Sequence, residues 1–224
     1  MLLHLVKKMK KTKKMKINKK HFRVAIFGSA RTKKGEKTYT FVHTLASMIA
    51  ENNMDLISGG GPGLMDAASR GHHSGRKKKK NNGSHSIGLT INLPFEQHDG
   101  FHLDIKKQFN KFSGRLDDFM KLSNVVVVAP GGIGTILELF YTWQLLQVKH
   151  ICDNVPIILL GPMWKGLIDW MEKQPMKKKL ISPKDLDNIF LVNTCPQAMK
   201  IINQAKGEFD KGHGKICLNI KKYK

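Results

Sequence analysis

Short apolar runs alternate with amphipathic stretches along most of the chain. The run at 125–129 is β-branched and lacks polar alternation, which is typical of a strand buried on both faces of a parallel sheet. A linker is expected at 181–193, where Asp185 or Asp187 caps a short turn. An irregular connection that contains a short strand is expected at 95–107. The pattern predicts strands at 22–27, 54–58, 86–93, 125–129 and 155–161, and helices at 37–52, 62–70, 115–123, 133–148, 164–173 and 196–206.

Repeated strand and helix units predict an α/β fold, a doubly wound parallel sheet with helices on both faces. The 224 residues are enough for a single domain. Glycine-rich turns follow the first, second and fourth predicted strands. Because ligands bind beyond the carboxyl ends of such strands, all three turns are expected to face one crevice. The candidates for phosphate contact in the first two turns are Gly28, Ser29, Gly60 and Gly61.

The third turn, in the segment PGGIGTILE at 130–138, joins a buried strand directly to an apolar helix. The first N–H groups of a helix have no internal partners and carry partial positive charge, so this junction favours an anion such as a phosphomonoester. The helix N-terminus is also expected to keep the carboxylate of Glu138 ionised. The competing interpretation is a tight turn with Glu138 on the solvated surface. Contacts with phosphate are expected from Gly131, Gly132, Gly134 and Thr135.

The net charge of +22 is concentrated in two tracts. Nine lysines lie within residues 1–20, predicted to be a basic disordered arm before a domain at 21–224, and five basic residues lie in a predicted loop insertion at 76–85. Solvated tails explain such tracts, but non-specific contact with polyanions through the arm is also compatible with them. A transit peptide is a further alternative.

Other bulk properties narrow the class of protein. No apolar run approaches the roughly 18 residues of a membrane helix, so no membrane partner is expected. Three cysteines without metal-ligand spacing predict reduced thiols in a cytoplasmic protein. The segments GGGPGL and GSARTKKGEKT match neither the dinucleotide fingerprint nor the P-loop. A ligand with a single phosphate fits the short glycine turns better.

The segment GGGPGLMDAASRG at 59–71, followed some seventy residues later by PGGIGTILE, resembles the LONELY GUY family of cytokinin riboside 5′-monophosphate phosphoribohydrolases, many of whose members are labelled "possible lysine decarboxylase". The resemblance extends over about 22–170 and also reaches the nucleosidase core of bacterial nucleotide 5′-monophosphate nucleosidases. It implies a Rossmann-like fold, a homodimer or larger homo-oligomer, and hydrolysis of a nucleoside 5′-monophosphate to free base and ribose 5-phosphate.

The resemblance also implies the residue roles. The motif PGGxGTxxE is matched in full, which makes Glu138 catalytic, and Arg115 stands where the family has its catalytic arginine. The resemblance requires no metal and no organic cofactor. Four positions depart from the family's usual residues, and they bear on base preference and rate: Leu116, Phe119, Leu137 and Tyr141.

Two alternatives stay open at this point. The first is a non-catalytic protein of the same fold that binds or senses a nucleotide. The second is a nucleic-acid-associated protein in which the basic arm is the functional part. Decarboxylation of lysine is disfavoured, because most lysines lie in solvated tracts rather than in a desolvated pocket. The apolar helix expected at 133–148 suggests a surface that pairs with a second copy.

Overall fold

The computed structural model describes residues 21–80, 82–92, 102–151 and 155–213, so the predicted arm at 1–20 lies outside the described residues. Within them, one parallel sheet of seven strands has the order β4-β3-β2-β1-β5-β6-β7. The strand order reverses beside β1, as in doubly wound folds. The strands are β1 (Arg23–Phe27), β2 (Asp55–Ser58), β3 (Ser86–Ile91), β4 (Ile105–Phe109), β5 (Val125–Val128), β6 (Ile157–Leu160) and β7 (Ile189–Val192).

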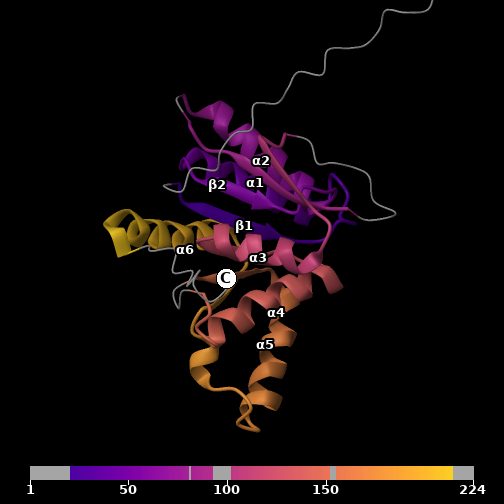
Figure 1. The fold of residues 1–224 in the computed structure, drawn as a ribbon, viewed down its shortest axis with the longest axis vertical. Coiled ribbons are helices and arrows are strands. Elements are labelled where there is room, and N and C mark those ends of the chain that lie inside the picture. The colour runs from indigo at the N-terminus through magenta and orange to yellow at the C-terminus, as the bar shows by residue number, and fades with distance from the viewer. Residues whose placement is uncertain (1–20, 81, 93–101, 152–154, 214–224) are drawn as a thin grey trace, which may run out of the picture.

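Helices cover both faces of this sheet (Figure 1). Helices α1, α2 and α6 pack on one face, and α3, α4 and α5 pack on the other. The predicted α/β class and the two-sided cover are therefore confirmed. The helices are α1 (Lys37–Glu51), α2 (Leu64–Lys78), α3 (Phe112–Leu122), α4 (Ile133–Gln147), α5 (Lys165–Met171) and α6 (Cys195–Glu208).

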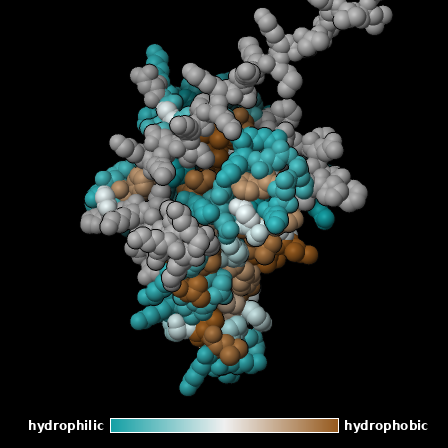
Figure 2. Space-filling model, viewed as in Figure 1, coloured by the Kyte–Doolittle hydropathy of each residue, from teal (hydrophilic) through white to brown (hydrophobic). Residues whose placement is uncertain are grey.

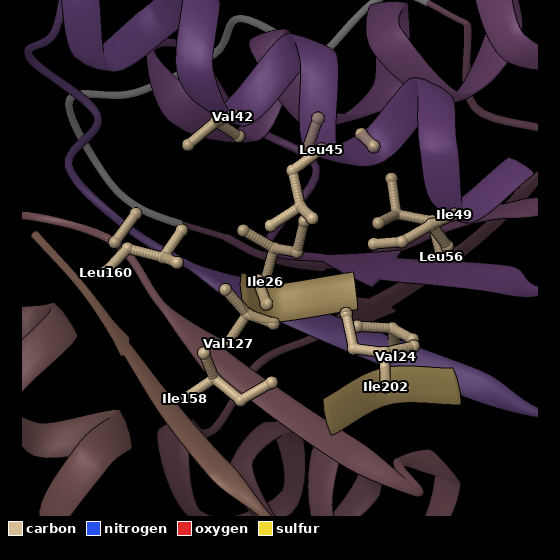
Figure 3. Packing of buried hydrophobic residues seen from close by; sticks show 14 of the residues in the cluster. Val24, Ile26, Val42, Leu45, Ile49, Leu56, Val127, Ile158, Leu160 and Ile202 are labelled. Atoms are coloured by element: carbon tan, nitrogen blue, oxygen red, sulfur yellow. The ribbon is translucent and has the colours of Figure 1, made fainter. Parts of the chain in front are cut away.

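Alternate residues of the central strands supply the two cores. On β1, Val24 and Ile26 face α1, whereas Ala25 and Phe27 face α3 and α4. Figure 3 shows Leu45 and its neighbours packed over the first of these surfaces. Because both faces are covered, the strands need apolar residues at every position, which explains the unbroken apolar runs.

Several boundaries differ from the sequence prediction. Strand β7 lies in the segment predicted to be a linker, where Ser182 and Asp185 form a capping box for the short turn Pro183–Leu186. Helix α2 runs to Lys78 instead of ending near residue 70, so the predicted loop insertion at 76–85 begins as helix.

Ion pairs connect the last turn of helix α2 to neighbouring segments. Arg76 pairs with Asp104 at 2.8 Å, and Lys78 pairs with Glu51 at 2.8 Å. These contacts fix side chains that the composition alone describes as a solvated basic run. Helix α2 also begins after Gly63, so Pro62 precedes the helix and does not occupy its first position.

The remaining helical turns are short, and along the chain they lie before α5, after α5 and after α6. Their bounds are η1 (Pro162–Trp164), η2 (Glu172–Met176), η3 (Pro183–Leu186) and η4 (Phe209–His213). Among the described residues, none of the helices is long and apolar enough to cross a membrane.

Helix α4 is buried on one side only. Leu139 and Trp143 enter the core, whereas Ile133 is 87% exposed and Leu137 is 47% exposed. The apolar helix expected at 133–148 is therefore only partly covered, and the apolar residues that remain at the surface leave an exposed apolar strip. Figure 2 shows hydrophobic surface in the part of the molecule where Figure 1 places α4 and α5.

Candidate active site

Backbone hydrogen bonds join the three glycine turns at the carboxyl ends of β1, β2 and β5. The Ser29 N–H donates to Pro130 O at 3.1 Å, and the Leu64 N–H donates to Ser29 O at 2.9 Å. One residue of the first turn therefore connects the other two. The turns form one rim, as predicted from their positions after parallel strands.

Glycine allows close packing at two points of this rim. A Cβ on Gly63, whose φ is +68°, would lie 2.4 Å from Ser29 O. A Cβ on Gly59 would lie 2.4 Å from an Nη atom of Arg115. The turn after β2 thus lets a guanidinium lie directly against the main chain.

The rim surrounds a cavity of about 1040 Å³. Nearly every residue predicted from the sequence to contact substrate lines it. They are Gly28, Ser29, Gly60, Gly61, Arg115, Gly132, Gly134, Thr135 and Glu138.

Gly131 is the exception, because it does not line the cavity. A Cβ at Gly131 would lie 2.1 Å from Thr135 Oγ1. Glycine at this position therefore makes room for the buried side chain of Thr135, which packs under the turn. The structure thus gives Gly131 a packing role, and its contact with phosphate stays a prediction.

Arg115 and Glu138 form an ion pair within the cavity. Arg115 Nη1 donates to Glu138 Oε1 at 3.2 Å, and Arg115 Nε donates to Leu89 O at 2.7 Å. The guanidinium also lies 5.1 Å from the ring centroid of Phe119. Side-chain exposure is only 10% for Arg115 and 12% for Glu138. The alternative that places Glu138 on the solvated surface is therefore wrong.

Burial controls the protonation of this pair. Burial raises the pKa of Glu138 to about 7, although the positive charge and hydrogen bond of Arg115 act in the opposite direction. Burial likewise lowers the pKa of Arg115, against the attraction of Glu138. This differs from the expectation that Glu138 stays ionised, because desolvation raises its pKa by more than Arg115 lowers it. Near neutral pH this carboxyl can hold or release a proton.

The N-terminus of α4 is open toward the cavity. Neither Gly132 nor Gly134 would bring an added Cβ within 4 Å of another atom, and both have negative φ. Neither packing nor backbone strain therefore requires glycine at these two positions. Free main-chain N–H groups at an uncrowded helix N-terminus are suited to binding a phosphate.

Sequence reasoning missed the residues that line the opposite wall. They come mainly from β3, from β4 and from the start of α3. Phe112 is 51% exposed beside the cavity, although it is a large hydrophobic residue. Recognising β4 as a full strand of the parallel sheet would have revealed this wall. The sequence pattern predicted only a short strand in an irregular connection there. The additional lining residues include Arg31, Asn92, Lys106, Gln108 and Phe112.

A family model described as possible lysine decarboxylase, which corresponds to the LONELY GUY family, matches residues 65–202. The chain belongs to this family. The matched segment includes both Arg115 and Glu138. The family resemblance predicted from the two glycine segments is therefore confirmed.

Curated relatives are distant and much longer. The chain is 27% identical over 136 residues to the pyrimidine/purine nucleotide 5′-monophosphate nucleosidase of Escherichia coli strain K12, and identical values hold for the enzyme of strain O157:H7. The match covers 57% of this chain but only 28% of the relative. The chain therefore spans only a little over a quarter of the length of these nucleosidases.

Solved structures agree on the fold. The molybdenum cofactor carrier protein of Chlamydomonas reinhardtii matches with a TM-score of 0.62 at 19% identity, covering 84% of this chain and 99% of that one. The X-ray structure of TM1055 matches with a TM-score of 0.62 at 21% identity, covering 82% and 99%. At such identities these likenesses establish the Rossmann-like fold alone.

Proposed function

We propose that this LONELY GUY protein hydrolyses the N-glycosidic bond of a nucleoside 5′-monophosphate to release free base and ribose 5-phosphate. The observation that carries the proposal is the buried pair of Arg115 and Glu138 in a cavity that also receives the open N-terminus of α4. An anion site and a carboxylate one helical turn apart suit the phosphate and the ribose of one nucleotide.

In the proposed reaction, the phosphate binds the main-chain N–H groups around Gly132 and Gly134. The ribose then lies over Glu138, with its base toward Phe112. The bond from ribose C1′ to the base nitrogen breaks, and its electron pair leaves with the base. Positive charge develops on the sugar, as in other glycoside cleavages.

Ionised Glu138 stabilises that positive charge and orients a water molecule toward C1′. The water oxygen forms the new bond to C1′ and keeps one proton, its second proton passes to Glu138 and on to solvent, and the departing base takes one proton from solvent. Arg115 holds the carboxylate in place through its hydrogen bond to Glu138, and in this proposal the same guanidinium assists the leaving group. The raised pKa of Glu138 lets it accept a proton near neutral pH.

Base recognition belongs to the wall formed by Asn92, Gln108 and Phe112. An exposed aromatic ring beside two amide side chains suits stacking on a base and hydrogen bonds to its edge. We infer a cytokinin riboside monophosphate or an AMP-like nucleotide as substrate. No metal or organic cofactor takes part in the proposed reaction. We propose the cytoplasm as its location, where a free buried thiol such as Cys195 stays reduced.

The second candidate is a nucleotide-binding protein that does not cleave its ligand. Two departures from the family's usual residues favour it. Leu137 is 47% exposed where many members have a glutamate, and Tyr141 donates a hydrogen bond to Asp117 at another such position. A binding function on this fold retains the phosphate site without requiring a reactive carboxylate.

Product chromatography distinguishes these two functions. The wild type and Glu138→Gln are incubated with AMP, GMP, pyrimidine monophosphates and isopentenyladenosine monophosphate. Release of free base by the wild type but not by the variant supports hydrolysis and ranks the substrates. Intact nucleotides together with calorimetric binding to both proteins support the non-catalytic function instead.

A further inference from the structure

A second cluster of polar side chains lies at the amino ends of the strands, away from the glycine turns. His21 comes two residues before β1, Asp55 begins β2, and His85 immediately precedes β3. The proposed nucleotide site occupies the opposite, carboxyl ends of these same parallel strands. The cluster is therefore separate from the reaction described above.

The three side chains converge on one carboxylate oxygen. His21 Nδ1 lies 3.1 Å from Asp55 Oδ1, and His85 Nδ1 lies 3.6 Å from the same atom. One ligand atom from each residue lies within 4.8 Å of the others. Tetrahedral zinc with bonds of about 2.0–2.1 Å separates neighbouring nitrogen and oxygen ligands by about 3.4 Å. The two measured distances lie on either side of that value.

The surroundings hold this arrangement in place. The side chain of Asp55 is 2% exposed, and its Oδ1 also accepts the backbone N–H of His85 at 2.8 Å. The two imidazoles are about one-quarter exposed, and their rings are stacked at 6.0 Å between centroids. A buried, oriented carboxylate with two accessible imidazoles leaves room for water as a fourth ligand.

One neighbouring charge opposes a cation here. Arg23 is buried and interacts electrostatically with Asp55, while its Nε donates to Leu122 O at 2.6 Å. That hydrogen bond directs part of the guanidinium toward the end of α3. Each imidazole binds a metal ion through a ring nitrogen that carries no proton.

We propose that His21, Asp55 and His85 bind a divalent transition-metal ion, with Zn²⁺ the best match to two imidazoles and one carboxylate. The ion ties the segment before β1 to the starts of β2 and β3. Its role is structural, because it is held at the end of the sheet remote from the cavity.

The full chain, freed of metal with a chelator, is titrated with Zn²⁺ in competition with a chromophoric chelator. The wild type is expected to bind one ion at this site, and His21→Gln and His85→Gln each to weaken that binding by at least about tenfold. Zn²⁺ should also raise the melting temperature of the wild type, but not of either variant. Co²⁺ in place of Zn²⁺ should give the intense visible absorption of a tetrahedral site.

His73→Gln is the matched control, since His73 stacks with His102 in another histidine pair, 4.2 Å between ring centroids. This variant should retain the binding and the Co²⁺ spectrum of the wild type. Equal Zn²⁺ affinity in the wild type and His85→Gln, or loss of the site in His73→Gln alone, overturns the proposal. A weak octahedral Co²⁺ spectrum overturns it as well.

Discussion

Arg115 Nη1 lies 3.2 Å from Glu138 Oε1, although 23 residues separate them in the chain. Helix α3 carries the arginine, and α4, which follows β5 in the chain and packs on the same face of the sheet, carries the glutamate. Both side chains are nearly buried, and burial disfavours the charged form of each. Burial raises the pKa of Glu138 to about 7, so the pH dependence of activity near neutrality can report on this carboxyl.

The first prediction concerns the pH dependence of catalysis. If ionised Glu138 stabilises the ribosyl cation, kcat/KM should rise with pH through about 7, the pKa to which burial raises this carboxyl. Initial rates of base release between pH 5 and 9 measure the profile. A flat profile across this range contradicts the assigned role of Glu138.

The second prediction concerns folding stability. Between pH 4.5 and 7 the folded protein keeps a proton on Glu138 that the unfolded chain has released, so the wild type loses stability as pH rises. Glu138→Gln removes this loss. Its free energy of unfolding relative to the wild type should rise by up to about 3 kcal/mol from pH 4.5 to pH 8. Urea unfolding at both pH values measures this difference, and a fall in the relative free energy of unfolding from pH 4.5 to pH 8 would contradict the prediction.

The third prediction separates ligand contact from packing at Gly134. Gly134→Ala should raise the free energy of unfolding by about 0.5–1 kcal/mol, because alanine favours a helix and meets no atom within 4 Å. The same change should raise KM by about tenfold, because a methyl group obstructs the phosphate. Thermal unfolding and steady-state kinetics measure the two effects.

Gly207→Ala is the control for that substitution. Gly207 lies in α6, is equally open and is remote from the cavity. It should gain similar stability with unchanged KM. An unchanged KM in Gly134→Ala would show that no phosphate lies against this part of α4.

The fourth prediction concerns the shape of the cation at residue 115. The Arg115 guanidinium donates to Leu89 O and to Glu138 at once while lying over the Phe119 ring. The single ammonium of Arg115→Lys cannot reproduce that planar arrangement. We expect kcat to fall by about 100-fold. Arg76→Lys, at a peripheral ion pair with Asp104, should keep kcat within about twofold.

The fifth prediction concerns assembly. We propose that two copies associate through the exposed apolar strip of α4, which includes Ile133 and Leu137. Leu137→Lys should shift the sedimentation coefficient from dimer to monomer at low micromolar concentration. Leu180→Lys, at a 72% exposed position outside this strip, should not. A monomeric wild type would exclude the proposed dimer.

The sequence predicted the sheet class and most elements because, in a chain of this size, few folds other than a covered parallel sheet can bury several continuous apolar runs. The run at 125–129 became β5 flanked by β1 and β6. Strand β7 was missed because Leu191 is 41% exposed and the strand forms an edge, so it lacks the doubly buried pattern. The end of α2 was misplaced because Gly71 and Gly75 resemble helix-ending residues in sequence, whereas in the structure they let α2 pack closely against the main chain of α1.

At the site, the motif supplied Arg115 and Glu138 but not their electrostatics. The helix N-terminus is visible in sequence and favours an ionised carboxylate, whereas the extent of burial depends on the packing of α3 against β3. Similarly, Gly131 and Gly132 are indistinguishable in the motif. Only the position of Thr135 shows that Gly131 makes room for a side chain while Gly132 opens onto the cavity.

The hydrogen bonds of Ser29 to Pro130 and Leu64 have a consequence for how this cavity can diversify. The part of the rim that suits a phosphate is made of main-chain N–H groups, which most substitutions leave in place. The wall assigned to the base is made of side chains from β3, β4 and α3. Related proteins can therefore differ in the base they accept by exchanging a few side chains of this wall, while the main-chain contacts to the sugar phosphate stay the same.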